Sequence, residues 1–106
     1  MARQLRWSPE AVEDVEAIAL YIERDSSYYA RAVVSRIVLL ADSIPEHAEL
    51  ARVVPEIGDP GYRERFVHKY RIIYRIETER VLIAAVIHGS RQLEPLVDRI
   101  RGVQEI

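Results

Sequence analysis

The sequence predicts an α+β fold, in which an N-terminal strand and an α-helical hairpin precede an antiparallel β-meander and a short C-terminal helix. Two observations predict it. Apolar residues between positions 11 and 44 recur at steps of three and four, the period of amphipathic helices. Between positions 70 and 76 they alternate with other residues, the period of a strand with one buried face. The length of 106 residues, without a long Pro-, Gly- or Ser-rich linker, predicts a single domain over residues 1–106.

The first half of the chain predicts one strand and two helices. Residues 3–7 read as a short strand, and Ser8 followed by Pro9 is typical of a helix start, because Ser caps free N–H groups and Pro has none. Asp25-Ser26-Ser27 interrupts this helix and can cap the next one, which Pro45 ends. The apolar stripes expected to pack together are Ala11, Val15, Ile18 and Ile22, and Ala30, Val33, Ile37, Leu40 and Ile44.

The second half predicts an antiparallel meander. A strand over 63–69 follows a Gly- and Pro-rich turn, and a strand over 70–76 places Tyr74 on the face under the helices. The unbroken apolar run from 81 to 87 is typical of a central strand that is covered on both faces. A short terminal helix is expected between residues 93 and 100. Its apolar residues are Leu93, Leu96, Val97 and Ile100.

Composition excludes several classes of function. There is no cysteine and only three scattered histidines, so we expect no disulfide, no metal site and no cofactor. No segment is apolar enough for a membrane span, and the N-terminus lacks the apolar core of a signal peptide, so we expect a soluble, cytoplasmic protein. The net charge of −2 argues against a protein that coats nucleic acid, since such proteins are usually strongly basic.

Four segments occur in a characteristic order along most of the chain. They are Trp7-Ser8-Pro9-Glu10-Ala11, Arg52-Val53-Val54-Pro55-Glu56, Tyr70-Arg71-Ile72-Ile73-Tyr74-Arg75-Ile76, and Val86-Ile87-His88-Gly89 followed by Arg91. This ordered set resembles the RelE/ParE superfamily of toxins from bacterial type II toxin–antitoxin operons, and its ending is more similar to the ParE branch. The resemblance implies a helical hairpin on a four-stranded antiparallel sheet. It also implies an antitoxin partner encoded in the same operon, in a hetero-oligomer or beside a homodimer of the toxin.

Similarity to ParE implies a plasmid-stabilisation toxin that binds and poisons DNA gyrase and is not an enzyme. The residues expected to contact the target are cations and one histidine on the sheet and after it: Arg65, Arg71, Arg75, His88 and Arg91. Strand alternation places Arg71 and Arg75 together on the sheet face opposite the helices. We expect that face to be exposed, so that replacing both by alanine leaves folding nearly intact.

Two other functions stay open. Similarity to the YoeB and RelE toxins implies a metal-independent endoribonuclease that cuts mRNA on the ribosome. Carried over by position, Glu56 would be the base, Arg71 would stabilise the phosphate and His88 would be the acid. The third alternative is a chain that has lost toxicity and only binds the antitoxin.

Each candidate also has a purely structural interpretation. Arg71 and Arg75 could be solvated, or they could pair across strands with Glu64 or Glu79. Glu56 could be solvated or form a salt bridge, and His88 could be a hydrogen-bonded structural residue.

The helical hairpin predicts the antitoxin-binding surface. Val12, Val34 and Val38 flank the two apolar stripes and exceed what one helix–helix seam needs. We therefore expect a segment of the antitoxin to lie across these residues. Tyr28 and Tyr29, at the start of the second helix, are expected to be packing residues.

Overall fold

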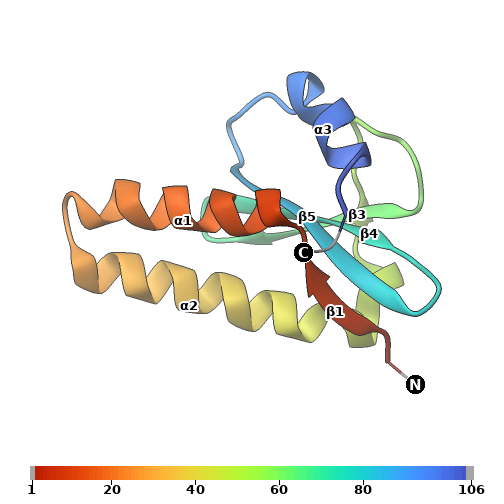
Figure 1. Ribbon diagram of the computed structural model, residues 1–106, viewed down its shortest axis with the longest axis horizontal. Coiled ribbons are helices and arrows are strands. Elements are labelled where there is room, and N and C mark those ends of the chain that lie inside the picture. Colours follow the sequence, from red (N-terminus) through yellow and green to blue (C-terminus); the bar gives the residue numbers. More distant parts are fainter. Residues whose placement is uncertain (1, 105–106) are drawn as a thin grey trace.

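The computed structural model describes residues 2–104, with helices and a C-terminal segment packed around one sheet (Figure 1). The elements in chain order are β1 (Gln4–Trp7), α1 (Pro9–Glu23), α2 (Ser27–Ser43), the 3-10 segment η1 (Ile44–Leu50), β2 (Arg52–Val53), β3 (Tyr62–Val67), β4 (Tyr70–Ile76), β5 (Arg80–His88), the 3-10 turn η2 (Glu94–Leu96) and α3 (Val97–Arg101). This order confirms the predicted α+β fold. Within residues 2–104, no helix is long and apolar enough to cross a membrane.

The sheet has the strand order β1-β5-β4-β3-β2, and β5 lies between β1 and β4. All residues from Val81 to Ile87 are buried, which confirms the prediction of a central strand. Two features differ from a four-stranded antiparallel sheet. The two-residue strand β2 adds a fifth strand beside β3, and β1 pairs parallel with β5. Parallel strands need a long crossover connection. Here the helices and the other strands, which lie between β1 and β5 in the sequence, form that connection.

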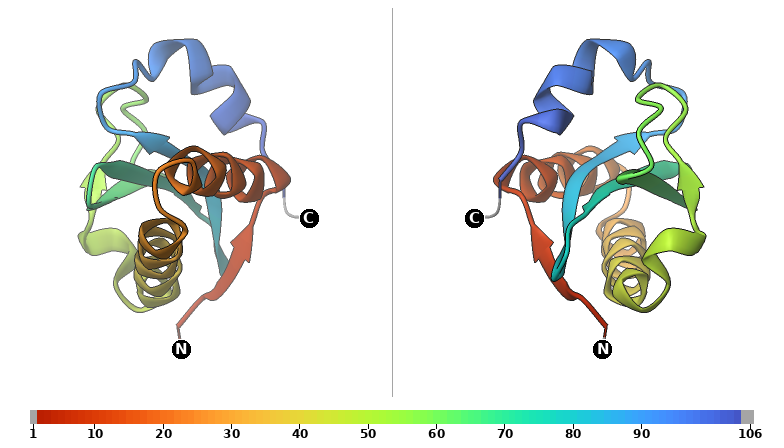
Figure 2. Two further views of the ribbon diagram at one scale, coloured as in Figure 1. Left: turned by 90° about the vertical axis from the view of Figure 1, so that its left-hand side faces the viewer. Right: turned by 90° about the vertical axis from the view of Figure 1, so that its right-hand side faces the viewer.

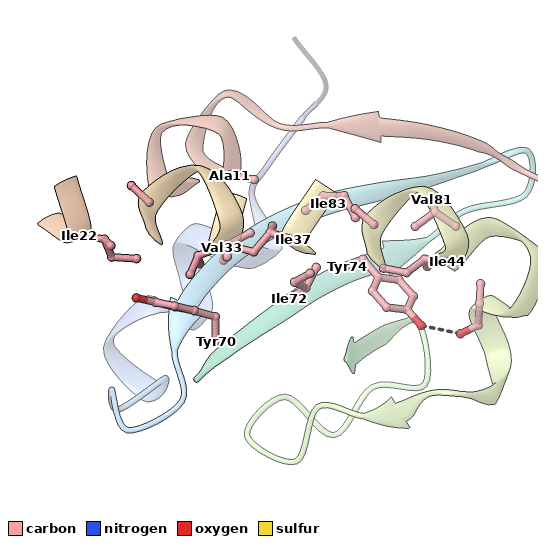
Figure 3. Packing of buried hydrophobic residues seen from close by; sticks show 14 residues of the cluster. Ala11, Ile22, Val33, Ile37, Ile44, Tyr70, Ile72, Tyr74, Val81 and Ile83 are labelled. Carbon is pink, nitrogen blue, oxygen red and sulfur yellow. Dashed lines mark hydrogen bonds between the residues drawn. The ribbon is translucent and has the colours of Figure 1, made fainter. Parts of the chain in front are cut away.

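The helical hairpin covers one face of the sheet. The side chains of Ser8 and Ser26 cap the two helices, accepting hydrogen bonds from the backbone N–H groups of Ala11 at 3.1 Å and Tyr29 at 3.0 Å. Both caps confirm the predicted helix starts. The stripes of α1 and α2 pack on the strand residues of this face, and Tyr74 points into this cluster, where its hydroxyl donates to the Ala48 carbonyl at 2.8 Å (Figure 3).

The other face of the sheet is covered by the C-terminal segment, and α3 and α2 lie on opposite sides of the sheet (Figure 2). The terminal helix is shorter than the predicted 93–100 span, because a 3-10 turn precedes it. Three apolar residues of the segment are buried against the sheet: Leu93, Ile100 and Val103. Arg99 also forms an ion pair with Asp14 of α1 at 2.8 Å. The expectation that this face is exposed is therefore wrong, because the segment buries the apolar residues that strand alternation places there.

Candidate functional site

Arg71 lies at the centre of a charged cluster and is itself shielded from solvent. Strand alternation puts it on the sheet face opposite the helices, as predicted, but only 5% of the residue is exposed. Its Nε donates to Glu64 at 2.9 Å, and its two terminal nitrogens each donate to a different oxygen of Glu56 at 2.9 Å. One terminal nitrogen also contacts Glu64 at 2.5 Å. Two carboxylates thus occupy four donor directions of one guanidinium group.

Glu64 links this pair to a further cation. Glu64 lies on β3, opposite Ile73 of β4, and its side chain is fully buried. Its second carboxylate oxygen is 2.7 Å from Nε of Arg52, which is mostly exposed. The cluster of Arg52, Glu64, Arg71 and Glu56, called the arginine–glutamate cluster below, therefore holds two positive and two negative charges and is neutral as a unit. The sequence leaves pairing with Glu64 open as an alternative but gives no signal for Arg52.

The pairing of Glu56 with Arg71 also favours the charged form of both side chains. Hydrogen bonds from Arg71 hold the pKa of Glu56 below its ordinary value, and the hydrogen bonds to Glu56 raise the pKa of Arg71 despite its burial. A general base works best with a pKa near the operating pH. Glu56 is shifted in the opposite direction, and both of its oxygens already accept from Arg71. The geometry therefore suits a structural ion pair better than an acid–base pair.

The remaining predicted cations are not gathered beside Arg71. Arg65 pairs with Ile72, whose side chain packs in the helix-side core, so Arg65 lies on the opposite face of the sheet from Arg71. Arg75 shares the face of Arg71, but it forms an ion pair with Glu77 at 2.8 Å and contacts the Arg101 carbonyl of the C-terminal segment. The expectation of a joint, exposed surface of these three arginines is wrong, because the register and the C-terminal segment separate and cover them.

His88 and Arg91 are exposed at the end of β5. His88 pairs with Tyr70, whereas Arg71 pairs with Ile87, so the two side chains leave the sheet on opposite faces. The His88 ring packs edge-on against Tyr70, with 5.6 Å between ring centroids, and its Nδ1 accepts from the Ser90 backbone N–H at 3.1 Å. The structure thus brings Glu56 and Arg71 together and leaves His88 on the other face.

The three valines of the predicted antitoxin-binding surface lie on the helical hairpin. Val12 and Val34 are half-buried, and Val38 is 40% exposed. Val34 lines a shallow groove between α1 and α2, together with Ala19 and Ala30. Val12 and Val38 do not line this groove, so the antitoxin-binding surface of the three valines stays a prediction.

A second hollow, on the far side of α1 from this groove, has no signal in the hydrophobic periodicity. Tyr29 lines it and is 43% exposed, and Tyr28 beside it is 76% exposed. Tyr29 packs edge to face against His68 of the β3–β4 turn, with 5.9 Å between ring centroids, but neither tyrosine belongs to the buried core. Within residues 2–104, no three His, Asp or Glu side chains are grouped so that they could hold a metal ion.

The sequence profile of the family described as "ParE toxin of type II toxin-antitoxin system, parDE" matches residues 5–93 of this chain. The chain belongs to this family. The match includes the helical hairpin, the sheet and the arginine–glutamate cluster, and it ends where the C-terminal segment begins to cover the sheet. This family member matches no curated protein sequence.

Several solved structures have a similar fold. The chromosomal ParDE toxin–antitoxin system from P. aeruginosa matches with a TM-score of 0.69 at 20% identity, over 82% of this chain and 96% of that chain. The YoeB dimer from Staphylococcus aureus matches with a TM-score of 0.57 at 21% identity, over 83% and 98%. The YoeB-YefM complex from the same organism matches with a TM-score of 0.53 at 21% identity, over 83% and 98%. At these identities the structures show that the ParE family member shares their fold.

Proposed function

We propose that this chain is the toxin of a type II toxin–antitoxin pair and that it acts in the cytoplasm by binding and poisoning DNA gyrase. The state of Arg71 carries the proposal. A phosphate-binding arginine needs free N–H donors and a net positive charge at the phosphate. Arg71 instead donates to two carboxylates within a neutral cluster, which favours a toxin that works through protein contacts.

The groups left for target contact lie at the end of β5. His88, the last residue of the central strand β5, is exposed, and so is Arg91 in the turn that follows the strand. Arg65 and Arg75 contribute less in this proposal, because the first is half-buried on the helix side and the second is paired with Glu77. Arg71 then supports the sheet and does not touch the target.

The antitoxin partner is part of the same proposal. Family membership supports it, and so does the fold shared with chains solved as toxin–antitoxin complexes. The groove lined by Val34, with Val12 and Val38 on the same hairpin, is one surface on which an antitoxin segment can bury apolar side chains.

One observation favours a second candidate, a ribosome-dependent endoribonuclease. Glu56 and Arg71 are in direct contact, and these are the two residues that similarity to YoeB assigns as base and phosphate ligand. The third residue of that set, His88, leaves the sheet on the other face. The positive charge of Arg71 is balanced by Glu56 and Glu64. The nuclease is therefore the weaker candidate.

A gyrase supercoiling assay tests the proposed function. We expect the purified chain to inhibit supercoiling and to increase the linear plasmid formed by gyrase, and the product of the adjacent antitoxin gene to relieve both effects. His88→Ala with Arg91→Ala should weaken inhibition by about tenfold or more, since charged groups at interfaces contribute strongly to affinity. Arg36→Ala, an exposed arginine of α2, is the control and should match the wild type. A folded wild-type chain without effect on gyrase would contradict the proposal, and inactivity toward mRNA as well would favour a non-toxic antitoxin-binding chain.

A further inference from the structure

The turn that follows β5 is closed by two backbone hydrogen bonds. The Arg91 N–H donates to the His88 carbonyl at 3.0 Å, which closes the turn over residues 88–91. The Gly89 N–H donates to the Lys69 carbonyl at 2.7 Å, and a Cβ at Gly89 would lie only 3.3 Å from the same oxygen. Glycine therefore allows a close approach to the β3–β4 turn. The two groups proposed to contact gyrase, His88 and Arg91, belong to this one closed turn.

The imidazole ring of His88 is oriented by two neighbours although it is exposed. It packs edge to face against the ring of Tyr70, which is itself buried, with 5.6 Å between ring centroids. Its Nδ1 lies 2.7 Å from the hydroxyl oxygen of Ser90 and 3.1 Å from the Ser90 backbone nitrogen. Both polar contacts of the ring thus come from one residue of the same turn.

The contacts with Ser90 determine which ring nitrogen carries the proton. A backbone N–H can only donate, so Nδ1 of His88 accepts and carries no proton, and the Ser90 hydroxyl donates to it as well. A neutral imidazole has a single N–H, which is consequently at Nε2. No group within residues 2–104 accepts a hydrogen bond from this Nε2, and His88 is exposed. Its N–H is therefore available to a partner.

The surroundings of His88 favour a negatively charged acceptor. Lys69 and Arg91 are exposed and line the same hollow as His88. One of the two acids of this hollow, Asp14, is already paired with Arg99 at 2.8 Å, so the positive charges exceed the remaining negative charge. Hydrogen bonds to an ionised acceptor are shorter and stronger than those to a neutral one. A carboxylate that accepts from Nε2 is thus also attracted by the two cations.

We propose that His88 contacts gyrase as a hydrogen-bond donor through Nε2, that the acceptor is a carboxylate, and that Ser90 is the positioning residue that holds His88 in this form. The inference rests on the proposed function, since it takes gyrase as the target, and it adds the chemistry of the contact. Without the Ser90 hydroxyl the ring loses the shorter of its two hydrogen bonds at Nδ1, so the preference for a proton at Nε2 weakens.

Replacing His88 by each of the two amides distinguishes the ring nitrogens. Glutamine carries its amide NH₂ close to the position of Nε2, whereas the shorter asparagine carries it close to Nδ1. In the gyrase supercoiling assay, His88→Asn should weaken inhibition by about tenfold or more, and His88→Gln should regain all but about threefold of it. His47→Asn, at an exposed histidine of η1, is the matched control and should act as the wild type does. If His88→Asn inhibits as well as His88→Gln, the assignment of Nε2 is overturned.

A double-mutant cycle tests the role of Ser90. Ser90→Ala should weaken inhibition by about threefold or more in the wild type but not in His88→Gln, because glutamine has no nitrogen at the position of Nδ1. A purely structural serine would cause the same loss in both backgrounds. Ser43→Ala, at an exposed serine that ends α2, is the control. Equal losses in the two backgrounds, or no loss in the wild type, overturn the role of Ser90.

Removing one charge tests the nature of the acceptor. Lys69→Gln should weaken inhibition by about threefold or more, with a loss that shrinks at high salt, whereas Arg36→Gln on α2 should not. Full inhibition by Lys69→Gln overturns the carboxylate as the acceptor. All substituted positions are exposed, so thermal unfolding of each variant should be close to that of the wild type.

Nitrogen NMR of the free chain gives a readout that does not depend on gyrase. At pH 8, above the ordinary histidine pKa of about 6.5, we expect an N–H at Nε2 and a bare Nδ1 for His88, and a mixture of both tautomers in Ser90→Ala. A proton at Nδ1 in the wild type overturns the inference and leaves the proposed function intact. A wild-type chain with the expected tautomer but without effect on gyrase overturns the proposed function and, with it, this contact.

Discussion

Replacing Arg71 by alanine is expected to lower the free energy of unfolding by about 3–5 kcal/mol, the range for removing one partner of a buried ion pair. The fully buried carboxylate of Glu64 would lose its closest cation, and Glu56 would lose both of its hydrogen bonds from Arg71. Urea denaturation of both proteins gives the difference. Arg75→Ala is the matched control: Arg75 and Glu77 keep 20% and 27% of their side chains exposed, so this change leaves no fully buried carboxylate without its cation and should cost clearly less.

The same prediction has a signature in the pH dependence of stability. Because Arg71 lowers the pKa of Glu56, the folded chain keeps this carboxylate ionised where the unfolded chain is protonated. That stabilisation is fully present above the ordinary glutamate pKa of about 4.3 and is lost as the pH falls through the lower pKa of the folded state. Glu56→Gln should therefore lose less stability than the wild type between about pH 5 and pH 3. An Arg71→Ala variant as stable as the wild type would show that Arg71 is a solvated cation.

Tyr74→Ala should cost about 3–5 kcal/mol, as for other aromatic truncations in a packed core. The ring is fully buried between the helical hairpin and the sheet, and the hydroxyl donates to the Ala48 carbonyl. Tyr74→Phe separates the two contributions. It keeps the ring and should cost about 1–3 kcal/mol, the range for leaving a buried acceptor unpaired. Urea denaturation measures both, and a small effect of Tyr74→Ala would mean that the faces of β4 are reversed.

Much of the fold is predictable because its signals are local. The caps at Ser8 and Ser26 and the period of the apolar residues depend on neighbours within a few positions. The same alternation correctly places Arg71 and Arg75 on the face away from the helices. The parallel pairing of β1 with β5 joins segments more than 70 residues apart, so no local pattern indicates it.

The state of the candidate site depends on such distant contacts. Burial of Arg71 requires Glu56 from a loop and Glu64 from the neighbouring strand, and alternation says nothing about either distance. Arg65 lies on the helix side because the two-residue turn at His68 sets its register opposite Ile72. The hollow beside α1 combines the helical hairpin, the β3–β4 turn and the end of β5, which lie far apart in the sequence, so no local pattern indicates it.

Cleavage of ribosome-bound mRNA by the purified wild-type chain tests most directly the claim that Arg71 is held by carboxylates and does not serve phosphate chemistry. We predict intact mRNA at concentrations of the chain that inhibit gyrase, because Arg71 and Glu56 are engaged with one another. Cleavage by the wild type that is lost in a folded Arg71→Lys variant, which keeps a positive charge but not the planar guanidinium, would contradict the account.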